Sequence, residues 1–263
     1  MKAFIRCALV IALMSAGTQA SPVTNWVLDA GPGIGSNLNT ASPTIGDGTV
    51  ESADAVTFHS DFPAITLANS GDAIILSGAV TLSGITATDA GTNQQLRFGL
   101  FDRLGSPNTN GWLGYFGANS TGANAGVIRQ RTAGNTDLFI SNTGSTIVAS
   151  TANPPNSKTG ATITNDTYNF LLQITRDGTN YDISGSLSGG PGGNFNDSFS
   201  INDLAPVATE TYTFNNVGFL LGTAMNVDQA QYSNVDVTYV PEPASLACLG
   251  LGSLLLLGRR RRR

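Results

Sequence analysis

A two-residue alternation of apolar and polar side chains is the feature that most constrains the fold of this chain. Apolar residues recur at alternate positions in residues 96–100, 168–174, 181–187 and 235–239. A period of two is typical of antiparallel strands with one buried face. Asp177-Gly178 separates two of these runs, and this dipeptide favours a type I′ hairpin turn. We therefore expect an all-β chain, an antiparallel β-sandwich of roughly a dozen short strands.

Three stretches in the second half carry a family resemblance. The run YNFLLQITRDGTNYDISGSL (168–187) is followed by TYTFNNVGFLLG (211–222) and by QYSNVDVTYV (231–240). A hairpin, a Phe-x-x-Val-Gly-Phe strand and a closing strand in this order resemble the concanavalin-like or laminin-G-like jelly roll over residues 94–240. The resemblance implies a curved sandwich whose concave face often meets carbohydrate, sometimes with bound calcium. Fold-level analogy does not by itself establish a ligand.

The C-terminus combines a proline-rich triplet, a short apolar segment and a basic end. The triplet is Pro241-Glu242-Pro243, the apolar segment is residues 244–258, and the basic end is Arg259, Arg260, Arg261, Arg262 and Arg263. As a helix the segment would span roughly 22 Å, short of the ~30 Å hydrocarbon core. The arginines resist translocation and keep the C-terminus cytoplasmic. The prolines predict an exposed, extended segment that a protease can reach. An ordinary single-span tail anchor is the alternative.

This tail resembles the PEP-CTERM sorting signal of Gram-negative bacteria that make extracellular polysaccharide. The resemblance implies a sorting signal at residues 241–263, with a motif at 241–243, a transmembrane helix at 244–258 and a basic stop at 259–263. It also implies an exosortase that cuts near the motif and releases or transfers the upstream domain. The inner membrane would then hold the chain only transiently, before it reaches the cell surface or extracellular matrix.

The N-terminus predicts export. Lys2 and Arg6 precede a ten-residue apolar stretch at residues 7–16, which is too short to span a membrane. Thr18-Gln19-Ala20 places small residues where signal peptidase requires them, so we expect cleavage between Ala20 and Ser21. An uncleaved N-terminal helix is the alternative. The expected organisation is a signal peptide at 1–20, an extracellular β-sandwich domain at 21–240 and the sorting signal at 241–263.

The expected mature domain is acidic and lacks cysteine. Both cysteines, Cys7 and Cys248, fall outside residues 21–240, so neither disulfides nor thiolate metal sites support this domain. It carries 17 acidic and 6 basic residues, a net charge of −11. A surface of this sign repels nucleic acid and anionic lipid and favours divalent cations or neutral glycans. We expect no nucleic-acid partner.

Catalytic signatures are sparse. His59 is the single histidine, and no Gly-x-Ser-x-Gly nucleophile motif occurs, so a Ser-His-Asp triad is not indicated. We expect His59 at a strand end or turn. Glycoside hydrolysis needs two placed carboxylates, but Glu51 and Glu210 are the domain's only glutamates and lie far apart. Most aspartates neighbour Gly, Asn or Ser, as turn residues do. We expect no enzyme activity.

Ligand-binding residues can be named only as hypotheses. Trp112 and Tyr115 lie in the densest aromatic segment and follow Asn110, so a ring and an amide could contact a sugar; the alternative is that both rings are core residues. For calcium, the conceivable oxygen ligands are Asp89, Asn93 and Asp102. No EF-hand or glycine-rich nonapeptide spacing supports them, and turn formation is the alternative. We expect no cofactor beyond this hypothetical Ca²⁺.

Three functions remain open at this point. The first is an exported, non-catalytic structural or interaction protein of the cell surface or of a biofilm or exopolysaccharide matrix. The second is a carbohydrate-binding, lectin-like module that uses Trp112 and Tyr115. The third and weakest is a polysaccharide lyase or hydrolase. The expected partners are signal peptidase, an exosortase-type enzyme and extracellular polysaccharide.

Overall fold

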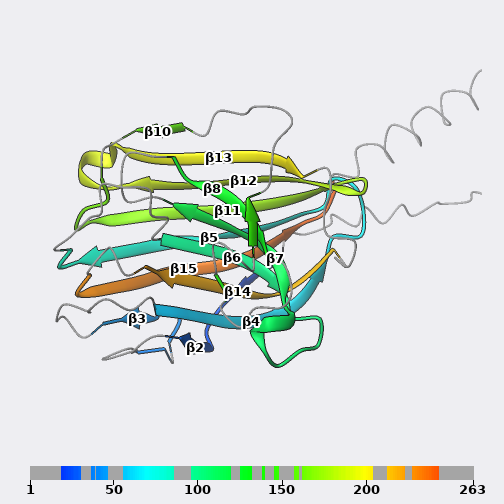
Figure 1. Ribbon diagram of the computed structural model, residues 1–263, viewed down its shortest axis with the longest axis horizontal. Helices are drawn as coiled ribbons and strands as arrows, with labels where there is room; N and C mark the ends of the chain where they lie inside the picture. Colours follow the sequence, from blue (N-terminus) through cyan, green and yellow to red (C-terminus); the bar gives the residue numbers. More distant parts are fainter. Residues whose placement is uncertain are drawn as a thin grey trace, which may run out of the picture.

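Two antiparallel β-sheets packed face to face form the body of the protein (Figure 1). The computed structural model describes residues 19–30, 37–38, 40–46, 56–85, 96–119, 125–131, 138–139, 145–147, 157–159, 162–203, 212–222 and 227–242. The expected β-sandwich is confirmed. The predicted hydrophobic part of the signal peptide, the 244–258 helix and the five arginines lie outside the described residues.

The larger sheet has eight strands in the order β1, β15, β5, β11, β12, β13, β10, and β3 also pairs with β15. Its strands are β1 (Gln19–Pro22), β3 (Thr44–Ile45), β5 (Ala73–Ser83), β10 (Ser157–Thr159), β11 (Thr167–Asp177), β12 (Asn180–Gly189), β13 (Phe195–Asp203) and β15 (Gln229–Val240). The strand that precedes the sorting tail, β15, therefore lies inside the sheet, between β1 and β5.

The smaller sheet has seven strands in the order β2, β4, β14, β6, β7, β8, β9. Its strands are β2 (Trp26–Ala30), β4 (Val56–Thr66), β6 (Leu96–Asp102), β7 (Leu113–Asn119), β8 (Val127–Arg131), β9 (Ser145–Ile147) and β14 (Thr213–Leu221). Two short 3-10 turns, Thr109–Gly111 and Pro191–Gly193, complete the described elements. Very short strands such as β3 and β9 were not predicted, because two or three residues carry no readable alternation.

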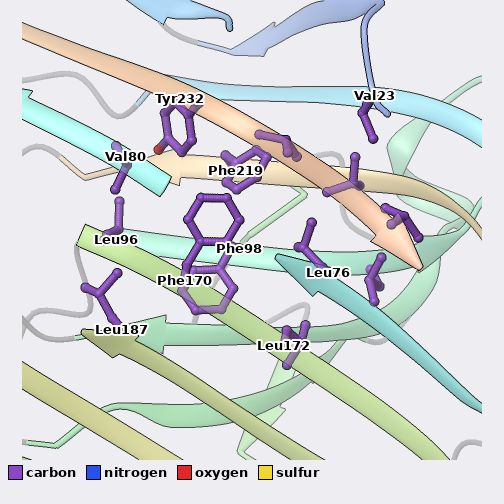
Figure 2. Close-up of a cluster of buried hydrophobic side chains, with 14 of the residues drawn as sticks. Val23, Leu76, Val80, Leu96, Phe98, Phe170, Leu172, Leu187, Phe219 and Tyr232 are labelled. Atoms are coloured by element: carbon purple, nitrogen blue, oxygen red, sulfur yellow. The ribbon is translucent and has the colours of Figure 1, made fainter. Parts of the chain in front are cut away.

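Aromatic side chains from both sheets form the centre of the inter-sheet core (Figure 2). The rings of Phe219 and Tyr232 lie 4.6 Å apart, and Phe170 meets Phe219 edge-on at 5.2 Å. Phe98 faces Phe170 at 5.5 Å. Such offset and edge contacts add to the stabilisation from burial itself. The alternation seen in the sequence supplies Phe98 and Phe170, because every second residue of β6 and β11 points inward.

A second apolar cluster covers the opposite face of the seven-stranded sheet. It consists of Phe101, Trp112, Phe116, Ala118, Leu138, Phe139 and Leu220. Leu100 belongs to the inter-sheet core and Phe101 to this cluster, as successive strand residues must. The buried Arg131 side chain donates to the carbonyl of Leu138 at 2.8 Å and of Trp112 at 3.0 Å. Part of this face is therefore occupied by the chain's own residues.

The β11–β12 hairpin confirms the predicted pairing and corrects the predicted turn. Asp177 pairs with Asn180, so the two loop residues are Gly178 and Thr179, not Asp177 and Gly178. Only Gly178 of these two has a positive φ, 62°. A type I′ turn needs positive φ at both central residues, whereas a type II′ turn needs it at the first only. The glycine thus fits the first central position of a type II′ turn.

Candidate functional site

The predicted sorting triplet, Pro241-Glu242-Pro243, leaves the sandwich directly from the end of β15. Val240 still pairs with Ala73 of β5, and Pro241 and Glu242 follow with no intervening loop. Proline has no N–H to continue the ladder, so the strand ends there. Both residues are half-buried. The predicted exposed segment is therefore partly docked over its first two residues, while Pro243 lies outside the described part.

A buried carboxylate receives this end of the chain. The backbone N–H of Glu242 donates to Asp72 Oδ1 at 2.8 Å. The other oxygen, Oδ2, accepts the backbone N–H of Asn69 at 2.8 Å and its side-chain amide at 3.3 Å. The hydroxyl of Tyr239 also bonds to the carboxylate. Asp72 is fully buried. A buried aspartate must be satisfied by several donors, and here one of them belongs to the sorting triplet.

These donors decide the charge state of Asp72. Burial raises the pKa of this carboxyl group, and the N–H groups of Glu242 and Asn69, with the side chains of Tyr239 and Asn69, lower it. The donors outweigh burial, so the pKa of Asp72 lies below its ordinary value. Burial and the neighbouring Asp72 both raise the pKa of Tyr239, which stays a neutral hydroxyl. The site therefore holds a carboxylate and a phenol.

The turn that carries Asp72 is braced from the β11–β12 hairpin. We call residues 67–72 the β4–β5 turn; in Figure 1 it lies beside the orange-red end of β15. Arg176 donates to the carbonyls of Leu67 and Ala68, both at 2.8 Å, and its carbonyl accepts the N–H of Gly71 at 2.7 Å. Arg176 also lies 4.0 Å above the Tyr212 ring. Asp72 therefore sits on a fixed support.

Glycine at position 71 lets Glu242 approach the turn. Gly71 has a φ of +97°, which other residues rarely adopt. A β-carbon at this position would lie 2.9 Å from Glu242 Cγ, closer than van der Waals contact permits. The backbone conformation thus requires glycine where the predicted sorting triplet crosses the turn, and a β-carbon there would displace the Glu242 side chain.

The predicted signal-peptidase site lies next to the sorting triplet. Gln19 and Ala20 of β1 pair with Tyr239 and Thr238 of β15, and Ser21 pairs with Val237. Because β1 is the outermost strand of its sheet, cleavage after Ala20 would uncover the edge of β15 at Thr238 and Tyr239. The two predicted processing points are therefore brought to the same edge of the sandwich.

The residues named for glycan contact are separated by the fold. Tyr115 points into the inter-sheet core, where its hydroxyl donates to Asp203 Oδ2 at 2.7 Å and accepts from Gln130 at 3.0 Å. Trp112 belongs to the second apolar cluster, and its indole N–H donates to the Ser106 carbonyl at 3.1 Å. Both rings are fully buried, so neither offers a face to a sugar. Asn110 is exposed in the β6–β7 loop.

His59 lies inside β4 and not at a strand end or turn, which corrects the expectation from sequence. Its ring meets Trp112 edge-on at 5.0 Å, and its Nδ1 is 3.2 Å from the amide nitrogen of Asn216. Burial lowers the pKa of His59; Asp61 raises it and Arg103 lowers it, and the net pKa is below the ordinary value. Asp61 is ion-paired with Arg103.

For calcium, the structure describes only one of the three conceivable ligands. Asp102 is buried, and its Oδ1 accepts the N–H of Leu104 at 2.9 Å and the amide of Asn215 at 3.1 Å. Asp89 and Asn93 lie outside the described residues. Within those residues, no three His, Cys, Asp or Glu side chains gather as a metal site requires.

Several aspartates that resemble turn residues in the sequence are buried acceptors in the structure. Asp197 accepts from the amide of Asn119 at 2.9 Å and from the N–H of Gly126 at 2.8 Å. Asp72, the residue that contacts the sorting triplet, was also missed. The sequence Asn69-Ser70-Gly71-Asp72 indicates a turn, but no local pattern identifies a partner 170 positions later.

A shallow polar groove crosses the outer face of the eight-stranded sheet. Its volume is about 470 Å³. It is lined by Ser77, Gly78, Ala79, Asn169, Phe170, Leu171, Ser186, Ser188, Asn234 and Asp236. Small hydroxyl and amide groups dominate this lining, and a single carboxylate, Asp236, contributes charge. Such a surface can hydrogen-bond a neutral, hydroxyl-rich molecule.

Comparison with solved structures identifies the class of fold. Arcelin-5, a lectin-like defence protein from Phaseolus vulgaris, superposes with a TM-score of 0.50 at 10% identity, covering 86% of this chain and 99% of that one. Winged bean acidic lectin, solved with methyl-α-D-galactose, gives a TM-score of 0.47 at 13% identity, covering 85% and 98%. The fold of the domain is thus similar to the lectin-like jelly roll of arcelin-5. A comparison with curated proteins gives no match.

The C-terminal tail matches a known sorting motif. The family model for the PEP-CTERM protein-sorting motif matches residues 240–263. The match starts at Val240, the last residue of β15, and the structure describes its first three residues. In the described portion of the chain, no helix has the length and apolar character needed to cross a membrane.

Proposed function

We propose that this protein is an exported component of the cell surface or extracellular matrix, sorted by its C-terminal signal, with a non-catalytic structural or interaction role. The observation that carries the proposal is the junction at Val240, where a protein-sorting motif begins on the last residue of a lectin-like sandwich. The β-sandwich is the domain that is exported, and residues 241–263 are its sorting signal. An acidic domain without cysteine suits an exposed, hydrated location.

Delivery would proceed through two cuts and one transient membrane stage. Signal peptidase removes residues 1–20 between Ala20 and Ser21. The segment 244–258 then stops in the inner membrane, with Arg259–Arg263 on the cytoplasmic side. An exosortase-type enzyme cuts near Pro241, Glu242 and Pro243 and releases the domain that spans residues 21–240. The shortness of the apolar segment, roughly 22 Å, suits such temporary retention.

Alanine substitution of both prolines of the triplet tests this proposal. In a host that makes extracellular polysaccharide, wild-type chain is expected in the surface or matrix fraction. Pro241→Ala with Pro243→Ala is expected to leave the chain in the membrane fraction with its tail intact. Pro63→Ala, an exposed site on β4, is the control and is expected to behave as wild type. Equal surface delivery of all three chains would contradict the proposal.

A carbohydrate-binding role is the second candidate, and the polar groove on the eight-stranded sheet favours it. Neutral matrix polysaccharide is the ligand class that matches hydroxyl and amide lining. Ser186→Arg would fill the groove, whereas Ala64→Arg places the same side chain on an exposed site of the other sheet. Glycan-array binding that is lost in the first variant and kept in the second would support this role. No binding by wild type, or equal binding by both variants, would contradict it.

A further inference from the structure

We propose that Asp72 restrains the sorting reaction: it holds Glu242 on the β4–β5 turn and so retards processing until this contact opens. The inference rests on the proposed sorting function and names a control element for the same site. It makes the folded domain itself part of the substrate that the processing enzyme meets.

The first argument concerns the backbone of Glu242. Proteolytic enzymes bind substrates as extended chains through backbone hydrogen bonds, in the manner of an added strand. The N–H of Glu242 is already donated to Asp72 at 2.8 Å. Its side chain also crosses Gly71 at close range. An enzyme that uses the triplet must therefore displace Glu242 from the turn before it can bind the backbone.

The second argument concerns reach. Val240 is still paired with Ala73, so only Pro241 separates the sheet ladder from the contact with Asp72. At about 3.3 Å per residue, Pro241 and Glu242 extend roughly 7 Å beyond the ladder. Because the chain is held on both sides of Pro241, the triplet cannot move far enough from the domain to enter the active-site cleft of a processing enzyme. Breaking the contact between Glu242 and Asp72 frees the triplet while β15 stays paired in the sheet.

The third argument is that the two oxygens of Asp72 have separable roles. Oδ1 accepts from Glu242, and Oδ2 accepts from the N–H and side-chain amide of Asn69. Asp72→Ala removes both sets of bonds and also the bond from the Tyr239 hydroxyl. Asn69→Ala removes only the side-chain bond at 3.3 Å and keeps the acceptor for Glu242. The second variant therefore tests the side-chain bond within the turn while the contact with Glu242 is kept.

The size of the effect follows from the population of the released state. A hydrogen bond to a buried charged group shifts a local two-state equilibrium by about tenfold. If release must precede cleavage, the rate of processing rises by the same factor when the bond is lost. We expect Asp72→Ala to process about tenfold faster than wild type and Asn69→Ala at the wild-type rate.

The experiment is a pulse–chase of full-length chain in a host with an active exosortase, following conversion of the tailed to the trimmed form. Faster conversion of Asp72→Ala, with Asn69→Ala unchanged, supports the proposal. An unchanged rate overturns it. A slower rate in folded Asp72→Ala also overturns it, because Asp72 would then present the triplet and not restrain it. Glu242→Gln keeps the N–H and the contact, and reports separately on recognition of the glutamate side chain.

Hydrogen exchange distinguishes failure of this inference from failure of the proposed function. In purified full-length chain, the Glu242 amide is expected to exchange about tenfold faster in Asp72→Ala than in wild type. The amides of central β15 are expected to be unchanged. If wild type is never trimmed in the host, the sorting proposal fails and exchange still decides whether Asp72 holds Glu242. Rapid exchange of Glu242 in wild type overturns the inference in either case.

Discussion

Glu242 and Asp72 stand 170 positions apart in the chain, and a 2.8 Å hydrogen bond joins them in the folded protein. One belongs to the C-terminal sorting motif and the other to the turn between the two long strands β4 and β5. The sorting motif is thus not simply appended to the domain. Its residue Glu242 is held by a buried carboxylate of the domain.

The charge on Asp72 should make stability depend on pH. Its pKa is lowered in the folded protein, so its contribution is present above the unfolded value of 3.8 and is lost as pH falls through the folded value. At neutral pH, Asp72→Asn is expected to lower the free energy of unfolding by about 1–2 kcal/mol. Denaturant titrations at neutral and acidic pH measure this. The difference in free energy of unfolding between wild type and Asp72→Asn should disappear in acid. A difference that does not change with pH would contradict the account.

Asp177→Asn is the matched control for that measurement. Asp177 is exposed at the end of β11, and its side chain has no comparable set of donors to lose among the described contacts. We expect a change within about 0.5 kcal/mol at either pH. A loss equal to that of Asp72→Asn would mean that overall charge, and not the buried site, sets the effect.

Two buried tyrosines should respond oppositely to loss of the hydroxyl. The Tyr232 hydroxyl is buried and has no hydrogen-bond partner among the described residues. Tyr232→Phe is therefore expected to leave the free energy of unfolding unchanged or to raise it by up to about 1 kcal/mol. Tyr115 bonds to Asp203 and Gln130, and Tyr115→Phe should lower the free energy by about 1–3 kcal/mol. Equal losses in the two variants, measured by denaturant titration, would contradict this assignment.

Arg131 should be difficult to replace even by lysine. Its guanidinium donates to the carbonyls of Trp112, Leu138 and, at 2.5 Å, Thr109. A lysine ammonium lacks the planar fork that reaches all three acceptors, so Arg131→Lys is expected to cost about 2–4 kcal/mol. Arg103→Lys alters a partly exposed ion pair and should cost less than about 1 kcal/mol. Thermal unfolding of both variants would contradict the account if the two losses were equal.

The sequence predicted the strands that alternate over many residues and missed features that depend on distant partners. The β11–β12 hairpin and β15 were readable, because every second residue contributes to the inter-sheet core. The sequence did not show which residues face which side of the seven-stranded sheet. Both faces are partly buried, so Trp112 and Tyr115 look alike in the sequence although they pack on opposite sides. Polar residues on the outer face of β4 likewise concealed that His59 is a strand residue.

Of the candidate site, the tail could be predicted from the sequence and its contact with Asp72 could not. The tail is a local pattern of composition, so its existence and position could be predicted from adjacent residues. The role of Asp72 depends on tertiary pairing of β15 with β5, which brings Glu242 to the turn. No neighbour in the sequence signals that contact. The juxtaposition of Ala20 with Thr238 is also a product of the sheet and not of local sequence.

The intact mass of the mature chain, recovered from surface and membrane fractions of a polysaccharide-producing host with and without its exosortase, tests the central claim most directly. The account predicts a surface chain that begins at Ser21 and ends at the sorting triplet when the exosortase is present. Without the enzyme, it predicts a membrane-bound chain that still carries residues 244–263. A surface chain with the complete tail, or identical products in the two hosts, would contradict it.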